Sequence, residues 1–255
     1  MSGLVKKQFQ LCMIGEKMRN VTRVFLSLFT LISAQAAQSE EILLTTEDYA
    51  PFNYLHEGEI VGIGPDQAHR IMSEAGIPYS IKIMQWSRAI GLAENKENTC
   101  VFTADLTPER AEKFVWVEPL YTDKMVLIAK NDFSKPVETV EESLTLTIGA
   151  QSGDSTQEVL ESLNYENIQT TKDLASSVKK LETGRIDAMA VSYDYFKVLK
   201  KQGLEVKEIL TLKEVKSGFA CHQNIDTEIT NKMQLASNNL ISSGEQDKII
   251  ENHNK

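Results

Sequence analysis

The chain has 255 residues, more than one short module needs, and its hydrophobic (42%) and charged (25%) fractions are those of a globular, core-forming protein. These values exclude wholesale disorder and a membrane protein with many spans. Acidic residues outnumber basic ones, 36 to 27, and no basic block is present. Because binding to a phosphate backbone needs clustered cations, we expect no nucleic-acid partner.

The first 36 residues have the composition of a secretory signal peptide. Arg19 and Arg23 precede an apolar run from Val24 to Ile32, and residues 34–36 form a cleavage site of the A-x-A type. The run is shorter than the roughly 20 residues that a membrane-spanning helix needs. We therefore expect export, with cleavage near Ala36; an uncleaved N-terminal anchor is the alternative.

Cleavage would make the mature chain more acidic, because the leader carries five basic residues and one acidic residue. A strongly acidic exported protein is repelled by an anionic membrane surface, so we expect it to be free in solution. Met18 is a second candidate start of translation, since residues 1–17 add no recognisable feature.

Export also bears on the cysteines. Cys12 lies in the leader, which leaves Cys100 and Cys221 in a compartment where disulfides persist. The residues alone leave two alternatives open, a disulfide or two buried thiols. The chain has no metal-type spacing of histidines, no Walker loop and no nucleophile elbow, so we expect neither a metal site nor a cofactor.

In chain order, the first half of the mature chain alternates strands and helices. One helix is expected from Pro65 to Ala75, where apolar residues recur at helical spacing and Gly76 follows. A second begins after Trp86, and Thr107 caps a third. The expected strands are 41–46, 81–84, 100–103 and 125–129.

The second half repeats this pattern. Residues 155–158 read as a capping box that begins a helix. Further helices are expected at 174–181 and 229–240, and strands at 146–150, 186–191 and 219–221. Two α/β halves without a flexible linker predict lobes that are joined by the strands themselves.

Four motifs in this order carry a resemblance to a known family. Residues 107–110 (TPER), followed by 115–121 (VWVEPLY), resemble the signature of family 3 periplasmic solute-binding proteins, the amino-acid-type receptors of ABC importers. Three further regions agree: 49–52 with 62–66, then 149–153, then 184–188. The resemblance spans essentially the whole mature chain.

The resemblance implies an α/β fold of the two-lobed type II periplasmic binding protein class, each lobe a mostly parallel sheet flanked by helices. Lobe one would be residues 40–126 and 220–255, and lobe two 127–219, with hinges near Leu127 and Phe219. The strands of Cys100 and Cys221 would then be neighbours, which favours the disulfide. The implied protein is a periplasmic monomer that closes about its hinge on a small polar solute, an amino acid or a related amine or acid, and passes it to an inner-membrane ABC permease.

In the family, an arginine at the position of Arg110 holds the α-carboxylate of the ligand, and aromatic walls stand at the positions of Tyr49 and Trp86. The alternatives are an Arg110 that pairs with a local acid such as Glu109, and aromatics that merely belong to the core. Arg88 lies in a first helical turn, where the helix dipole disfavours a cation. This unfavourable position is an indication that Arg88 contacts the ligand; the alternative is an arginine that is exposed to solvent.

From lobe two, the resemblance implies that Gln151 and Ser155 close over the ligand. Two departures concern the substrate. Asp105 stands where the family has Thr or Ser, and Ser192, followed by Tyr193, stands where it has an Asp. Asp105 would either supply the charge for an α-ammonium group or neutralise Arg110 and leave no α-amino-acid site.

Binding without catalysis is the expected function. One alternative is an enzyme, because a periplasmic dehydratase of prephenate-like acids shares the implied fold, and Glu47 or Asp105 could serve as its acid or base. The other is an orphan receptor for a signalling partner.

Overall fold

The computed structural model describes residues 41–253 of the chain. The predicted signal peptide and its cleavage site lie outside these residues. No helix in the described part is long and apolar enough to cross a membrane.

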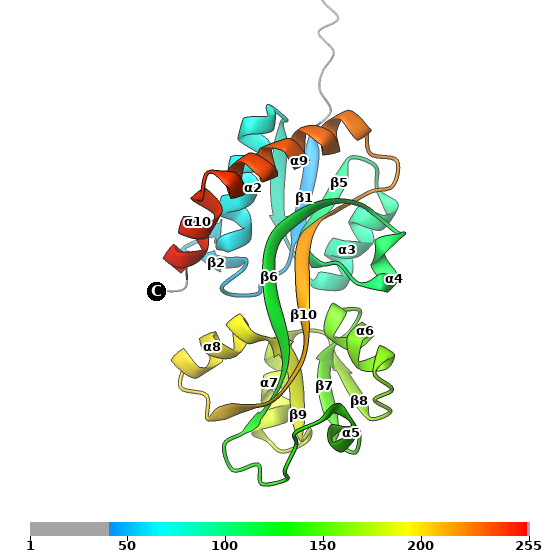
Figure 1. The fold of residues 1–255 in the computed structure, drawn as a ribbon, viewed down its shortest axis with the longest axis vertical. Coiled ribbons are helices and arrows are strands. Elements are labelled where there is room, and N and C mark those ends of the chain that lie inside the picture. Colours follow the sequence, from blue (N-terminus) through cyan, green and yellow to red (C-terminus); the bar gives the residue numbers. More distant parts are fainter. Residues whose placement is uncertain (1–40, 254–255) are drawn as a thin grey trace, which may run out of the picture. The chain divides into compact units, whose positions relative to one another are not determined.

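An eight-stranded sheet organises the described residues, with the strand order β4-β1-β5-β10-β6-β9-β7-β8 (Figure 1). The pairs β1–β4 and β1–β5 on one side, and β7–β8 and β7–β9 on the other, are parallel. The two parallel groups are the lobe sheets, and the predicted two-lobed α/β fold class is confirmed. The strands are β1 (Ile42–Thr46), β4 (Tyr79–Ile83), β5 (Thr99–Asp105), β6 (Val115–Lys130), β7 (Ile148–Gln151), β8 (Ile168–Thr171), β9 (Ala188–Ser192) and β10 (Val206–Cys221), beside a separate hairpin of β2 (Tyr54–His56) and β3 (Glu59–Val61).

Two long strands, β6 and β10, connect the lobes. Each has 16 residues, and they pair antiparallel from Val115 opposite Cys221 to Lys130 opposite Val206. In lobe one β10 pairs with β5, and in lobe two β6 pairs with β9. Figure 1 shows the two strands running side by side through both lobes. The prediction that strands join the lobes is confirmed, although residues 125–129 and 219–221 are only the ends of much longer strands.

Helices cover both sheets. Helix α2 buries Ala68, Ile71 and Met72 in the core of lobe one, and it ends at Gly76, whose left-handed φ of 66° a residue without a Cβ adopts freely. A second core lies under α7 and α8 in lobe two. The helices are α2 (Ile63–Ala75), α3 (Trp86–Asn95), α4 (Pro108–Ala111), α5 (Val140–Ser143), α6 (Ser155–Ser162), α7 (Leu174–Glu182), α8 (Tyr193–Lys201), α9 (Thr227–Ser242) and α10 (Glu245–His253).

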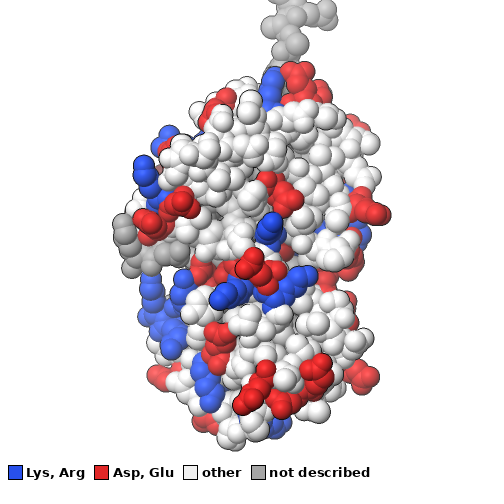
Figure 2. All heavy atoms as spheres, in the orientation of Figure 1, with Lys and Arg blue, Asp and Glu red and all other residues white. Residues whose placement is uncertain are grey.

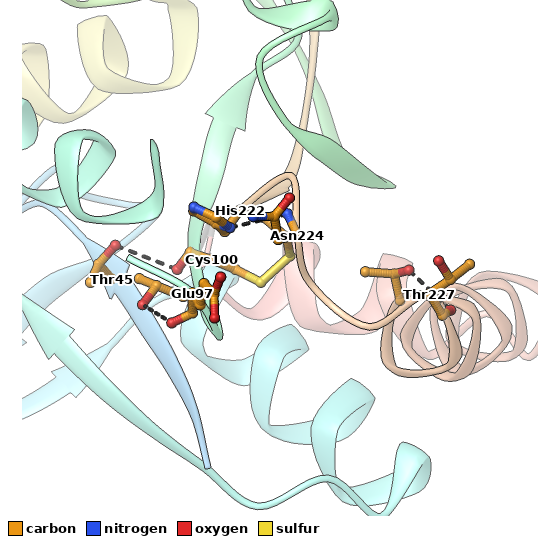
Figure 3. Close-up of a disulfide and its surroundings, with 9 residues drawn as sticks. Thr45, Glu97, Cys100, His222, Asn224 and Thr227 are labelled. Carbon is orange, nitrogen blue, oxygen red and sulfur yellow. Dashed lines mark hydrogen bonds between the residues drawn. A yellow bond between two sulfur atoms is a disulfide. The ribbon is translucent and has the colours of Figure 1, made fainter. Parts of the chain in front are cut away.

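A disulfide joins Cys100 on β5 to Cys221 at the end of β10 (Figure 3). The two residues are direct partners in the antiparallel pairing of these strands, and both are fully buried. The bond ties the strand on which the chain re-enters lobe one to the centre of that lobe's sheet.

Charged side chains of both signs are interspersed on the face shown in Figure 2. No broad basic surface appears on that face.

Candidate ligand-binding site

A cavity of about 40 Å³ lies where the strand ends of the two lobes meet. This volume is well below the range of about 300–1,000 Å³ typical of small-molecule sites, so the lobes leave little free space between them. Aromatic and acidic side chains dominate the lining, and none of the described lining residues is lysine or arginine. The lining residues are Glu47, Tyr49, Phe52, Trp86, Thr103, Asp105, Tyr121, Asp123, Met125, Asp154, Ser155, Thr156, Ser192, Val215 and Ser217.

Three of the four lining carboxyls have raised pKa values. Burial is the main cause for each, and it raises the pKa of Glu47 to about 8, that of Asp105 to about 7 and that of Asp123 to about 6. Nearby Asp154 raises the first two further, because like charges disfavour ionisation. Hydrogen bonds from the other lobe oppose the shift: Gln151 Nε2 donates to Glu47 Oε2 (2.6 Å), and Ser155 Oγ donates to Asp105 Oδ2 (2.5 Å). These three carboxyls therefore keep their protons to a higher pH than ordinary carboxyls do.

Arg110 lies in the short helix α4, directly after β5, and only 2% of it is exposed. Its Nε donates to Glu158 Oε1 at 2.8 Å, and its Nη2 donates to the carbonyl oxygen of Gly153 at 3.1 Å. Thr107 Oγ1 donates to the second oxygen of Glu158 at 2.6 Å. A carboxylate from lobe two is thus paired with the guanidinium from lobe one.

These contacts correct two expectations. Glu109 does not pair with Arg110; its carboxylate lies 3.2 Å from Lys113 Nζ, so the local-acid alternative is wrong. The capping box at residues 155–158 is also wrong. Asp154 caps α6 by accepting a hydrogen bond from the Thr156 N–H, because the hydroxyl of Ser155 and the carboxylate of Glu158 are both bonded across the cleft.

The aromatic walls come from both sides of the cleft. Tyr49 packs edge-on against Phe52 of its own lobe and Tyr195 of the other, and its hydroxyl accepts a hydrogen bond from Ser192 N at 3.0 Å. Trp86, the first residue of α3, is buried and donates from Nε1 to the Gly153 carbonyl at 2.8 Å. The Arg110 guanidinium lies 5.3 Å from the centre of the Trp86 ring, a cation–π distance. Both aromatics touch the opposite lobe as well as the cavity.

Thr103, also in the lining, has a left-handed φ of 55°, which is rare for a β-branched residue. The register of β5 against β10 shifts at this point, since Phe102 and Ala104 oppose successive residues of β10. Its hydroxyl accepts from Asn53 Nδ2 (2.7 Å) and donates to the Phe102 carbonyl (2.7 Å). Backbone strain of this kind concentrates at ligand sites.

The structure brings most of the predicted residues together. Tyr49, Trp86, Asp105, Ser155 and Ser192 line the cavity. Arg110 and Gln151 are buried beside it, each bonded to a residue of the opposite lobe.

Two predicted residues lie elsewhere. Arg88 is exposed on α3. Tyr193 packs against Phe196, with Lys197 Nζ 5.5 Å from its ring centre. Neither is among the lining residues.

Several lining or cleft residues were not predicted. Phe52 lies inside one of the quoted motifs, and Asp154 stands between a predicted strand and a predicted helix, so both positions carried a signal. Tyr121 is the last residue of the quoted motif 115–121 and carried a signal too, whereas Asp123 lies in a part of β6 that was not predicted as a strand. Glu158 gave no signal, because its position fitted a local capping role equally well.

Comparisons with known proteins place the chain in a family. The family model described as bacterial extracellular solute-binding proteins, family 3, matches residues 42–255. The arginine-binding extracellular protein ArtP of Bacillus subtilis (strain 168) is 25% identical over 224 residues, which cover 85% of this chain and 86% of ArtP.

Two solved structures are similar in fold. The arginine-, lysine-, histidine-binding protein ArtJ of Geobacillus stearothermophilus has a TM-score of 0.75 at 23% identity, with 84% of this chain and 94% of that one covered. The ancestral amino acid-binding protein AncCDT-1, a precursor of cyclohexadienyl dehydratase, has a TM-score of 0.73 at 21% identity, with 84% and 95% covered. At these identities the likeness shows the fold alone.

Proposed function

The chain belongs to family 3 of the bacterial extracellular solute-binding proteins, and from this membership we propose that it binds a small, positively charged solute of the amino-acid or amine class. The composition of the cavity lining is the observation that supports a positively charged solute. Among the described residues, the lining has four carboxyl groups and aromatic walls but no basic side chain. Aromatic faces and carboxylates both attract organic cations. The names of ArtP and ArtJ, which bind basic amino acids, support the same class.

Tyr49 and Trp86 are the proposed walls, and Asp105, Ser155 and Ser192 the proposed polar contacts. Arg110 and Gln151 hold the two lobes together around the cavity through Glu158 and Glu47. Arg88 and Tyr193 are not proposed as ligand contacts, because neither lines the cavity.

Hinge closure is the proposed motion. We propose the division into residues 40–126 with 220–255, and 127–219, to within a few residues, since Met125 already pairs with β9 and Phe219 with β5. Only β6 and β10 need to bend for the lobes to part. We further propose that the protein works in the periplasm, as a monomer, after removal of residues 1–36, and delivers its solute to an ABC permease.

A thermal-shift screen tests the proposed function. Arginine, lysine, agmatine and cadaverine form the positively charged set, and glutamate and glutamine are the controls. A ligand that binds only the folded state stabilises it by about 2.7 kcal/mol at a hundredfold excess over Kd. We expect at least one charged compound to raise the melting temperature and neither control to do so. No response to any member of the charged set would contradict the proposal.

Tryptophan fluorescence locates the binding. Trp86 lines the cavity, whereas Trp116, the other tryptophan, is half-buried and packs against Phe114 outside it. The emission change on binding should disappear in Trp86→Phe and persist in the matched variant Trp116→Phe. The reverse pattern would place the ligand elsewhere.

Catalysis is the second candidate. Glu47 has a pKa of about 8 and is therefore largely protonated at neutral pH, as a general acid must be. Incubation with prephenate or arogenate tests this role directly. Turnover that is lost in Glu47→Gln would replace the binding proposal, and unchanged substrate would support binding without chemistry.

A further inference from the structure

The carboxylate of Glu158 occupies Arg110 in the way that a bound carboxylate ligand would. One oxygen accepts from the guanidinium Nε and the other from the Thr107 hydroxyl. The side chain of Glu158 is 16% exposed and that of Arg110 2%, so the pair is largely removed from water. Hydrogen bonds between charged groups in such surroundings are strong and directional.

The other two guanidinium nitrogens are less fully used. Nη2 donates to the carbonyl oxygen of Gly153. Nη1 is buried and has no hydrogen-bond partner among the described residues, so its N–H groups could still donate to a ligand oxygen. A carboxylate ligand that bound side-on, through Nε and Nη2, would have to displace Glu158 and leave that charge without its partner, and breaking such a buried pair is strongly unfavourable.

The cavity itself also disfavours a carboxylate. Its lining carries Glu47, Asp105, Asp123 and Asp154, and Arg110 is not part of that lining. A ligand carboxylate placed there would face acidic side chains and no basic one, whereas an ammonium or guanidinium group would favour the ionised form of these carboxyls and face the rings of the aromatic walls.

This inference rests on the proposed function. We propose that the ligand is a primary amine or a guanidinium compound, a small organic cation that has no carboxylate. Glu158 then takes the place on Arg110 that the carboxylate of an amino acid would fill. The protein then discriminates between an amino acid and its decarboxylated counterpart. The contact between the lobes that the carboxylate of an α-amino acid would make with Arg110 is made instead by the chain's own Glu158.

Matched ligand pairs test this inference. Isothermal titration of the wild-type protein compares agmatine with arginine and cadaverine with lysine, because the members of each pair differ only in the α-carboxylate. In at least one pair, we expect the decarboxylated compound to bind tenfold or more tightly than the amino acid.

A variant then tests the role of Glu158. In Glu158→Ala the guanidinium loses its internal partner, so the preference should shift by tenfold or more toward the amino acid. Glu161→Gln is the matched control on the same helix, since Glu161 is exposed and accepts a hydrogen bond from Gln157; the preference should not change there. Circular dichroism checks that both variants fold, and the wild-type comparison stands without them.

Each result separates the two proposals. Equal or tighter binding of arginine and lysine than of agmatine and cadaverine would overturn this inference and leave the proposed function intact. An unchanged preference in a folded Glu158→Ala would overturn the role of Glu158. If no amino acid and no amine bound, the proposed function would fail and this inference with it.

Discussion

At the scale of single residues, the ion pair between Arg110 and Glu158 is the contact on which the site depends. The sequence indicated Arg110 through a four-residue motif, but it could not indicate the partner. Glu109 is adjacent in the chain, yet it lies on the exposed side of α4, whereas Glu158 is 48 residues away and reaches Arg110 only because the lobes meet. Pairings of this kind depend on tertiary geometry and leave no local pattern.

A double-mutant cycle should measure this pair. We expect Arg110→Ala to lower the free energy of unfolding by about 3 kcal/mol, because it strands a largely buried carboxylate. The double variant Arg110→Ala/Glu158→Ala should lose about 1–2 kcal/mol less than the sum of the single variants. Urea denaturation gives all three values. Glu109→Gln serves as the control and should change stability by less than about 0.5 kcal/mol. Strict additivity would show that the pair is not coupled.

Glu47 should make stability depend on pH. Its pKa is about 8 in the folded protein against 4.5 as the ordinary value, so the folded state holds a proton that the unfolded state has lost. The stabilisation is therefore present below about pH 4.5 and is lost as the pH rises to about 8. We expect the melting temperature of the ligand-free protein to fall across pH 5–8.

The variant Glu47→Gln should make this dependence less steep, since an amide does not titrate and can still accept a hydrogen bond from Gln151; Asp105 and Asp123, whose pKa values are also raised, supply the rest. Glu41→Gln, at an exposed position just before β1, is the control. Differential scanning fluorimetry at half-unit pH steps would measure both. Identical slopes in wild type and Glu47→Gln would assign the pH dependence to other groups.

At the scale of elements, periodicity predicted well where a helix or strand has one uniform environment. The helix at 65–75 was found because its apolar face is regular, and the structure extends it only to Ile63. The long strands were not found, since β6 and β10 pass from a buried lobe through a partly exposed crossing into a second buried lobe, and their burial changes along the way. Helix α10 has no fully buried residue, so it shows no apolar stripe to detect.

The disulfide is the covalent link between these elements, and it should contribute strongly to stability. Cys100 and Cys221 are 121 residues apart in sequence. Closing a loop of that length stabilises a folded chain by roughly 4–5 kcal/mol in the chain-entropy model. We expect a reductant to lower the urea midpoint of the wild type markedly and to leave Cys100→Ser/Cys221→Ser unchanged. Two free thiols in the secreted, non-reduced protein, seen by mass spectrometry, would refute the bond.

At the scale of the whole molecule, the order of the elements predicted two α/β halves joined by strands, and the family resemblance supplied the two-lobed type II class. The contents of the cleft were not predictable, because they depend on which side chains the two lobes bring face to face. Asp105 illustrates the difference: the sequence singled it out as a departure, and only the structure shows that it bonds to Ser155 of the opposite lobe.

The position of β10 also bears on how the protein is made. The central neighbour of β5 is supplied by residues 217–221, near the end of the chain, whereas β1, β4 and β5 are synthesised early. A polypeptide that leaves the cytoplasm with its amino terminus first thus cannot complete its first sheet until almost all of it has been translocated. If the chain is exported as proposed, the bond between Cys100 and Cys221 can therefore form only after almost the whole chain has crossed the membrane.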